Sequence, residues 1–297
     1  MKRLTGLKKR NTINFYAFIA PWLFGFLVLT VYPMLESFRL SLTNTGFAGD
    51  GDYIGFQNFI QAFTIETSVL IAFKNTFLYV LMFVPCSLVL SFFLGWLLSR
   101  QIRFLGFFRS VFYIPYLTAG VAVTIMWGWL FNGTFGLINY ALSFFGLQGP
   151  NWLGDKSTAL ISIVIMNLWS IGNGVLIMLA GIQDIPRSYF ESAEIDGAST
   201  WRQIISITIP LSTPTIYFNL VIGVIGAFQL FNQPYILTNG GPVDSTMTVS
   251  LFIFRNAFEY GKMGYASAVA WALFFAIMAV VLLLQASQRK WVFYGDS

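Results

Sequence analysis

The sequence has very little charge for its length. Charged residues make up 10% of its 297 residues, against about 25% in an ordinary soluble domain. Hydrophobic residues make up 57%, and the mean hydropathy is +0.71. So few charges cannot cover a water-facing surface, so the composition excludes a soluble globular protein and predicts an integral membrane protein.

The chain also lacks the residues on which many active sites depend. It has no histidine, which is the commonest general base and metal ligand. A single cysteine, Cys86, excludes an internal disulfide and a cysteine-based zinc cluster. The Gly261-Lys262 pair has no glycine at the earlier position that a nucleotide-binding phosphate loop requires. We therefore expect this chain to bind no metal and no cofactor, and to have no catalytic residue.

Long runs without Asp, Glu, Lys or Arg predict membrane-spanning helices. A helix needs about 20 apolar residues to cross a hydrocarbon core about 30 Å thick. The runs predict an all-α fold with six spans, at residues 13–35, 76–98, 109–131, 158–181, 210–236 and 265–287. Pro234 is expected to kink the fifth span just beyond Gln233. The predicted organisation is a basic tail at 1–12, a transmembrane domain at 13–287 and a second tail at 288–297.

The positions of lysine and arginine predict the orientation, because cytoplasmic loops carry an excess of both. With the N-terminus inside, five of the 17 basic residues lie outside: Arg39, Lys74, Lys156, Arg255 and Lys262. The other 12 lie inside, so both termini are expected in the cytoplasm. The first span is longer than the apolar part of a signal peptide and is expected to be retained. Topology thus explains the net charge of +5, and nothing supports nucleic-acid binding.

One cytoplasmic loop, at residues 184–210, is longer and more acidic than a simple connection needs. Glu191 and Glu194 are three residues apart and hence on one helix face. Gly197 suits the position just after a helix end, where a positive φ is free of strain for glycine. The pattern predicts a helix, a glycine corner and a second helix from Ser199. It fits either a docking element or a passive solvated connection.

This loop resembles the EAA loop of permease subunits of ATP-binding-cassette importers. The pattern E-x-A-x-x-x-G, nine residues and I-x-x-P is carried by Glu191, Ala193, Gly197, Ile207 and Pro210. Ser192 stands where the sugar-importer form has its first alanine. Over roughly residues 160–245 the sequence is similar to oligosaccharide permeases related to the larger maltose permease subunit, with further matches at Asn167-Leu-Trp169, Leu179–Pro186 and Leu237–Pro242.

The resemblance implies a six-helix permease of the type I importer kind with short cytoplasmic coupling helices, in a bacterial cytoplasmic membrane. It implies a heterodimer with a second homologous permease, two cytosolic ATPase subunits that bind ATP and Mg, and an extracytoplasmic solute-binding protein. The substrate would be a sugar or oligosaccharide, and membrane lipid would surround the chain. The residues implied in ATPase coupling are Glu191, Ala193, Glu194, Asp196, Gly197 and Ala198.

Polar residues inside the fourth and fifth spans are candidates for the substrate path, since polar groups are costly in hydrocarbon. Amides both donate and accept hydrogen bonds and aromatic faces pack on sugar C–H groups, which selects Trp169, Asn173, Asn219, Gln229 and Asn232. The maltose-permease resemblance places the substrate-facing side of the fifth span at Gly223, Gly226, Ala227 and Leu230. Equally, the amides would serve to bond neighbouring helices, and the glycines to let helices pack closely.

Two other classes of function are alternatives to the permease. An intramembrane enzyme acting on sugars or lipid-linked sugars would need a base, a nucleophile or a metal site within the bilayer, and the charge-free spans offer none. A secondary transporter would need membrane-embedded acids for ion coupling. Glu36, near a span edge, is the single candidate for such an acid.

Overall fold

The computed structural model describes residues 2–47, 49, 51–100, 104–118 and 120–294; Arg103, one of the basic residues expected inside, and the last residues of the C-terminal tail lie outside these ranges. One isolated antiparallel bridge joins Thr43 to Tyr53, and the regular elements of the described residues are otherwise helices. The all-α fold class is thereby confirmed.

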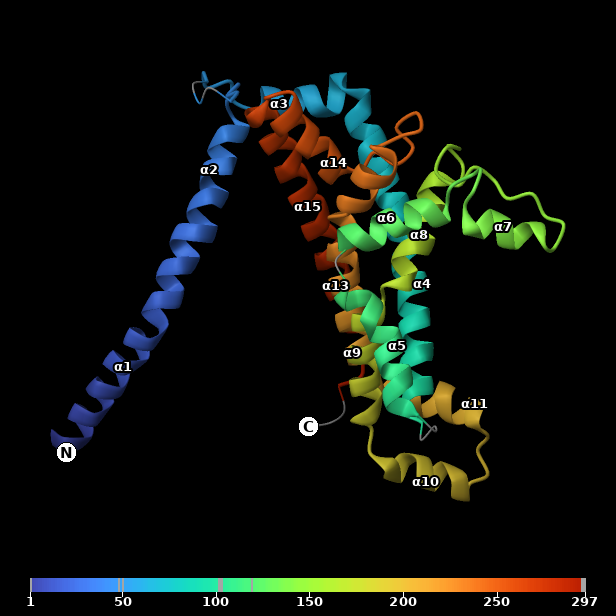
Figure 1. The fold of residues 1–297 in the computed structure, drawn as a ribbon. Coiled ribbons are helices and arrows are strands. Elements are labelled where there is room, and N and C mark those ends of the chain that lie inside the picture. The colour runs from blue at the N-terminus through green and yellow to red at the C-terminus, as the bar shows by residue number, and fades with distance from the viewer. Residues whose placement is uncertain (1, 48, 50, 101–103, 119, 295–297) are drawn as a thin grey trace.

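The first span is a helical arm that stands apart from the rest of the molecule (Figure 1). It consists of α1 (Lys2–Phe26), a π-helical segment η1 (Leu27–Val31) and α2 (Tyr32–Ser41). Side chains such as Phe18, 86% exposed, and Leu29, 77% exposed, face outward from it. An apolar surface of this kind requires lipid or another protein chain around it.

The arm meets the bundle near its far end, where α2 packs against α15 (Met263–Gln288). The rings of Phe38 and Trp271 lie edge to face with centroids 5.0 Å apart, and Trp271 donates a hydrogen bond to Ser37 Oγ at 3.1 Å.

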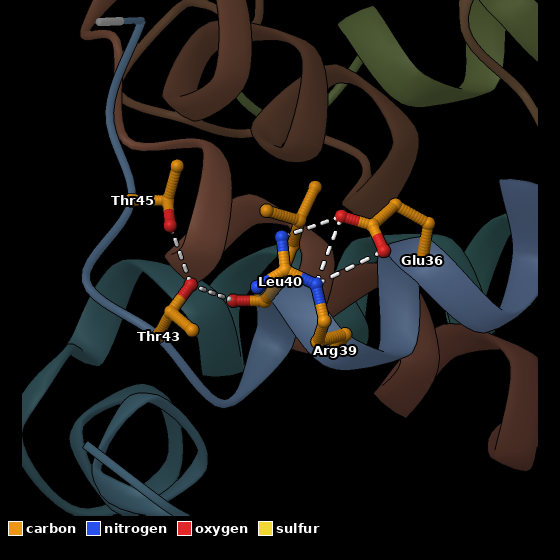
Figure 2. Close-up of polar contacts among 5 residues, drawn as sticks. All are labelled: Glu36, Arg39, Leu40, Thr43 and Thr45. Atoms are coloured by element: carbon orange, nitrogen blue, oxygen red, sulfur yellow. Dashed lines mark hydrogen bonds and ion pairs between the residues drawn. The ribbon is translucent and has the colours of Figure 1, made fainter. Parts of the chain in front are cut away.

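Beyond this contact the end of α2 is held by its own polar side chains (Figure 2). Arg39 Nε donates to both carboxylate oxygens of Glu36, at 2.9 and 3.0 Å. Thr43 Oγ1 donates to the carbonyl of Leu40 at 2.8 Å and also bonds Thr45 Oγ1 at 2.6 Å. The bond from Thr43 satisfies a backbone carbonyl in the last turn of α2, where helix carbonyls lack a partner within the helix.

Of the other spans, two are straight helices or nearly so and three are bent pairs. α4 (Thr67–Ser99) and α15 are long and apolar enough to cross a membrane unbroken, as is the arm from Asn14 to Ser41. The bent pairs are α5 (Leu105–Leu117) with α6 (Gly120–Leu130) at 96°, α8 (Ala159–Trp169) with α9 (Gly172–Gln183) at 48°, and the segment Thr200–Leu211 with α13 (Thr213–Phe228) at 64°. Counting each pair as one span gives the six that the sequence predicts.

Short elements join the spans at both ends of the bundle. At one end lies α10 (Arg187–Ile195), and at the opposite end lie α3, α7 and α14 (Figure 1). The segment Thr200–Leu211 comprises α11 (Thr200–Gln203), η3 (Ile204–Thr208) and α12 (Ile209–Leu211). The remaining short elements are α3 (Gln57–Ile60), η2 (Gln61–Ile65), α7 (Leu137–Ser143), η4 (Pro234–Thr238), α14 (Val249–Phe254) and η5 (Arg255–Glu259).

The fifth span differs from the prediction in where it breaks. The helix α13 ends at Phe228, and the chain leaves helical geometry at residues 229–231, well before Pro234. Pro234 instead begins η4, a position where a residue without an N–H is tolerated. The break upstream is stabilised from elsewhere, because Thr248 Oγ1 donates to the freed carbonyl of Leu230 at 2.8 Å.

α4 is the central element, since α8, α9, α13 and α14 all pack against it. Its closest approach is to α9, where a Cβ at Gly95 would lie 2.8 Å from Met178 Cβ. Around α4, α8, α13, α14 and α15 the buried apolar side chains form one continuous core, with Phe228 and Val69 fully buried. The spans that carry the candidate site are therefore held on a rigid helix.

Candidate translocation cavity and coupling loop

A cavity of about 430 Å³ lies among α4, α9, α13 and the break that follows α13. Its lining is rich in groups that both donate and accept hydrogen bonds. The amides are Asn167, Asn173, Asn219, Gln229, Asn232 and Gln233, and the hydroxyls are Tyr79, Ser87, Ser91, Tyr116 and Ser170. All of its lining side chains are uncharged. Such a lining suits a ligand with many hydroxyl groups.

Eight of the nine residues predicted for the substrate path line this cavity: Asn173, Asn219, Gly223, Gly226, Ala227, Gln229, Leu230 and Asn232. Trp169 is the exception, because it does not line this cavity. Its ring packs against Trp127, with centroids 6.0 Å apart. Successive residues of a helix point about 100° apart, so Asn167 and Ser170 face the cavity while Trp169 does not.

Four of the five glycines in these spans divide into two kinds. A Cβ on Gly226 would meet nothing within 4 Å, and one on Gly223 would approach only Val84, at 3.9 Å. By contrast, a Cβ on Gly172 would collide with the carbonyl of Phe112, and one on Gly174 would lie 2.8 Å from Ser91 Oγ. The glycines of α13 therefore leave open space beside the cavity, whereas those of α9 allow close packing on α5 and α4.

The amide side chains also fall into two groups, those with a hydrogen-bond partner in the protein and those without one. Asn219 donates to the carbonyl of Gly174 at 3.2 Å and so joins α13 to α9. Asn173, Gln229 and Asn232 make no side-chain hydrogen bond with any residue that the structure describes. Their polar groups remain available to a ligand or to water.

Three side chains in the lining of the cavity are joined by hydrogen bonds. Gln233 Nε2 donates to Asn167 Oδ1 at 3.0 Å, and Asn167 Nδ2 donates to the hydroxyl of Tyr79 at 2.9 Å. Tyr79 is 2% exposed. These hydrogen bonds connect the segment after the break to α8 and to α4.

The contribution of α4 to the cavity is absent from the sequence prediction. Tyr79, Phe83, Ser87 and Ser91 all line it, at intervals of four residues. Residues four apart share one helix face, so this spacing is a signal that the sequence carries. The other polar lining residues absent from the predicted path are Tyr116 of α5, Asn167, Ser170 and Gln233.

The loop at residues 184–210 forms the predicted pair of helices. α10 ends in a Schellman motif: the N–H of Gly197 donates to the carbonyl of Glu194 at 3.0 Å, and that of Ala198 to the carbonyl of Ala193 at 2.8 Å. Gly197 has φ +74°, which favours glycine. Ser199 then caps α11, accepting a hydrogen bond from the N–H of Arg202 at 3.4 Å.

The outward surface of this loop is both acidic and apolar. Glu191, Glu194 and Asp196 are exposed, and none forms an ion pair with another described residue. Ile195 beside them is 87% exposed, and Tyr189 is 52% exposed. The loop projects beyond the end of the bundle (Figure 1). An exposed apolar residue among carboxylates is typical of a surface that another protein covers.

The structure weakens both alternative functions. Glu36, the candidate coupling acid, is engaged by Arg39 in the arm (Figure 2), away from the cavity. Within the described residues no cluster of three or more acidic or cysteine side chains could hold a metal ion.

Comparisons with known proteins agree on one family. The model of the binding-protein-dependent transport system inner membrane component matches residues 69–292. A probable ABC transporter permease protein of Bacillus subtilis, YesP, is 39% identical over 99% of this chain and 96% of its own length. The lactose transport system permease protein LacF of Rhizobium radiobacter is 31% identical over 96% of this chain and 98% of its own. The arabinooligosaccharides permease protein AraP of Bacillus subtilis is 30% identical, over 90% and 86%.

The fold itself is also known. A crystal structure of a bacterial ABC transporter involved in the import of the acidic polysaccharide alginate contains a chain that superposes with a TM-score of 0.80, at 24% identity, over 97% of this chain and 99% of that one. The expected type I importer permease fold is confirmed by this similarity.

Proposed function

The chain belongs to the family of binding-protein-dependent transport system inner membrane components, and we propose that it is the permease subunit of an ATP-driven importer of sugars or oligosaccharides. It is therefore a multi-pass membrane transport component rather than an enzyme. Relatives named for arabinooligosaccharides and for lactose support a saccharide as the cargo.

The observation that carries the proposal is the cavity of about 430 Å³ with its amide and hydroxyl lining. Sugar hydroxyls require partners that donate as well as accept, and three amides there have no partner among the described residues. Open space beside Gly223 and Gly226 leaves room for a sugar ring against α13. Phe83 and Phe231 add aromatic surface, which packs favourably on C–H groups of a sugar.

The loop at residues 184–210, which we call the coupling loop, connects two helices that line this cavity. α9, which ends at Gln183, carries one wall of the cavity, and α13, which begins at Thr213, carries another. The chain between them is the loop that bears Glu191 and Gly197. We propose that this loop docks on cytosolic ATPase subunits, which bind the ATP and Mg, so that their motion displaces α9 and α13 relative to each other.

The proposed assembly contains a second, homologous permease, two ATPase subunits and an extracytoplasmic solute-binding protein. An unpacked arm with exposed Phe18 and Trp22 supports a neighbour beside this chain in the membrane. We place both termini and α10 in the cytoplasm, because most of the lysine and arginine residues then lie inside.

Reconstitution of the complete importer in proteoliposomes tests the function. The solute-binding protein is first screened with lactose, maltose, arabino-oligosaccharides and alginate pentasaccharide, and the bound sugar is then used in radiolabelled form. We expect ATP-dependent uptake that requires this chain and the binding protein. ATP hydrolysis without accumulation of any bound sugar, or uptake driven by an ion gradient without ATP, would contradict the proposal.

A further inference from the structure

A second hollow lies at the α10 end of the bundle and adjoins the cavity described above at Leu88, which lines both. It is a groove of about 420 Å³ between α4 and the segment that returns from the coupling loop. One wall is formed by α4 from Leu88 to Trp96, and the other by side chains between Trp201 and Ile216. Every lining side chain is aliphatic or aromatic. Ile205, 63% exposed, and Phe93, 48% exposed, stand at its opening.

The groove lies between α4 and the segment that returns from the coupling loop, and these two walls have little direct contact with each other. α11 contacts η3, and η3 contacts α12. Among the described residues, none of these three elements has an extensive interface with α4. An apolar space in a membrane protein is not left empty, because voids lose dispersion contacts. Water is also excluded, since the lining offers almost no hydrogen-bonding group.

The end of the groove nearest α10 has the features of a membrane interface. Two tryptophans, Trp96 and Trp201, line it, and tryptophan is enriched at the depth of lipid headgroups. The guanidinium of Arg100 lies over the Trp96 ring, 4.3 Å from its centroid. Arg202 follows Trp201 directly in α11.

Both arginines are exposed, and neither side chain forms a hydrogen bond or an ion pair with another described residue. A guanidinium stacked on an aromatic face keeps its N–H donors directed outward in its own plane. The natural partner of exposed guanidinium groups at this depth is a phosphate, which arginine binds with charge-assisted hydrogen bonds.

From the groove and the two arginines together, we infer that this is a binding site for an anionic phospholipid, with an acyl chain between α4 and η3 and the headgroup phosphate at Arg100 and Arg202. An apolar helix from another chain would fill the groove but would leave both cations unpaired. A phospholipid satisfies the apolar walls and the charges at once. Anionic lipids are also attracted to basic segments at the cytoplasmic face.

The site has a consequence for transport, because η3 and α12 lead from the coupling loop into α13. An acyl chain packed between η3 and α4 would brace this segment, so that displacement of α10 is passed on to α13 instead of being lost in the gap. The binding itself does not depend on which solute the importer carries. Its test is therefore independent of the proposed cargo.

The direct test uses the assembled importer in vesicles of equal parts phosphatidylglycerol and phosphatidylcholine. After extraction, native mass spectrometry measures which lipid stays bound. We expect the wild-type complex to retain phosphatidylglycerol in clear excess. Arg100→Gln with Arg202→Gln should bring the retained ratio back to the one-to-one ratio of the vesicle, and Ile205→Trp, which fills the groove, should reduce retention of both lipids.

Matched controls separate this site from the general lipid belt. Arg289→Gln removes another exposed arginine at the end of α15, and Leu282→Trp enlarges an exposed side chain of α15. Neither should alter the retained lipid. Unchanged phosphatidylglycerol retention in both groove variants would overturn the inference. So would a photoreactive residue at position 205 that cross-links to another protein subunit and not to lipid.

Discussion

Gln233 donates a hydrogen bond to Asn167 across 3.0 Å, although the two residues belong to different spans. The segment that follows the break in the fifth span is thereby fixed to α8. Asn167 in turn bonds Tyr79 of α4. The break at residues 229–231 can thus separate the motion of α13 from that of the segment beyond it, which remains attached to two other helices.

We predict that Asn167 and Gln233 are energetically coupled. Asn167→Ala leaves the Tyr79 hydroxyl and the Gln233 amide without their partner, and an unsatisfied buried group costs about 1–3 kcal/mol. In a double-mutant cycle, the combined loss in free energy of unfolding should differ from the sum of the single losses by about 0.5–3 kcal/mol. Denaturant unfolding of the purified complex measures it. Asn75→Ala is the control, because the Asn75 side chain bonds only the Asp244 and Met247 carbonyls. Additive losses in the Asn167/Gln233 cycle would show that the two residues are not energetically coupled.

We predict that Gly226→Trp blocks transport without preventing assembly. No atom lies within 4 Å of a Cβ at Gly226, so an indole would extend into the cavity instead of displacing the core. Uptake in proteoliposomes should fall to near background while the partner subunits still co-purify. Leu282→Trp, which places an indole on the exposed surface of α15, should transport normally. Normal uptake by both variants would place the path elsewhere.

We predict that Glu191→Lys weakens association with the ATPase subunits. Glu191 is exposed and unpaired on α10, so a carboxylate is available to a basic residue of the ATPase. Truncating one partner of a desolvated interfacial pair typically costs about 2–5 kcal/mol, and reversing the charge adds repulsion. Co-purification at increasing salt measures the loss. Asp155→Lys makes the same change on an exposed residue before α8, at the other end of the bundle, and should leave association unaltered.

We predict that the corner at Gly197 needs its backbone conformation and not merely a small side chain. The residue has φ +74° with open space around its Cβ position, so steric clash with neighbours is not the obstacle. Gly197→Val should uncouple ATP hydrolysis from uptake, because β-branched residues are strongly disfavoured at positive φ. Gly197→Asn should retain most of the coupling, since asparagine tolerates this region. Equal effects of the two variants would argue against a conformational role.

The orientation predicts accessibility to reagents. In a Cys86→Ser background, a cysteine at Ser143, the last residue of α7, should react with an impermeant maleimide added to intact cells. A cysteine at Ser199 should react only after the membrane is opened. Both serines are exposed, so burial does not confound the result. The reverse pattern would invert the topology.

The sequence predicts those features whose causes are local. The corner at Gly197 and the helices on either side depend on a glycine, a capping serine and the spacing of charges within a few residues. The break after Phe228 does not, because the run Phe228–Phe231 stays mostly apolar and the stabilising hydroxyl comes from Thr248, 18 residues later. The absence of Trp169 from the cavity lining has a related cause. The residue type suits a sugar, but which side of α8 faces the cavity is set by packing against α4.

The contact between α2 and α15 joins a segment that is synthesised early to one that is synthesised much later. Ser37 and Trp271, which share a hydrogen bond there, are 234 residues apart. At a synthesis rate of about 5–20 residues per second, the arm exists in the membrane for roughly 10–50 s before its partner in the same chain has been made. During biogenesis the first span must therefore be stable in lipid on its own or be held by the insertion machinery.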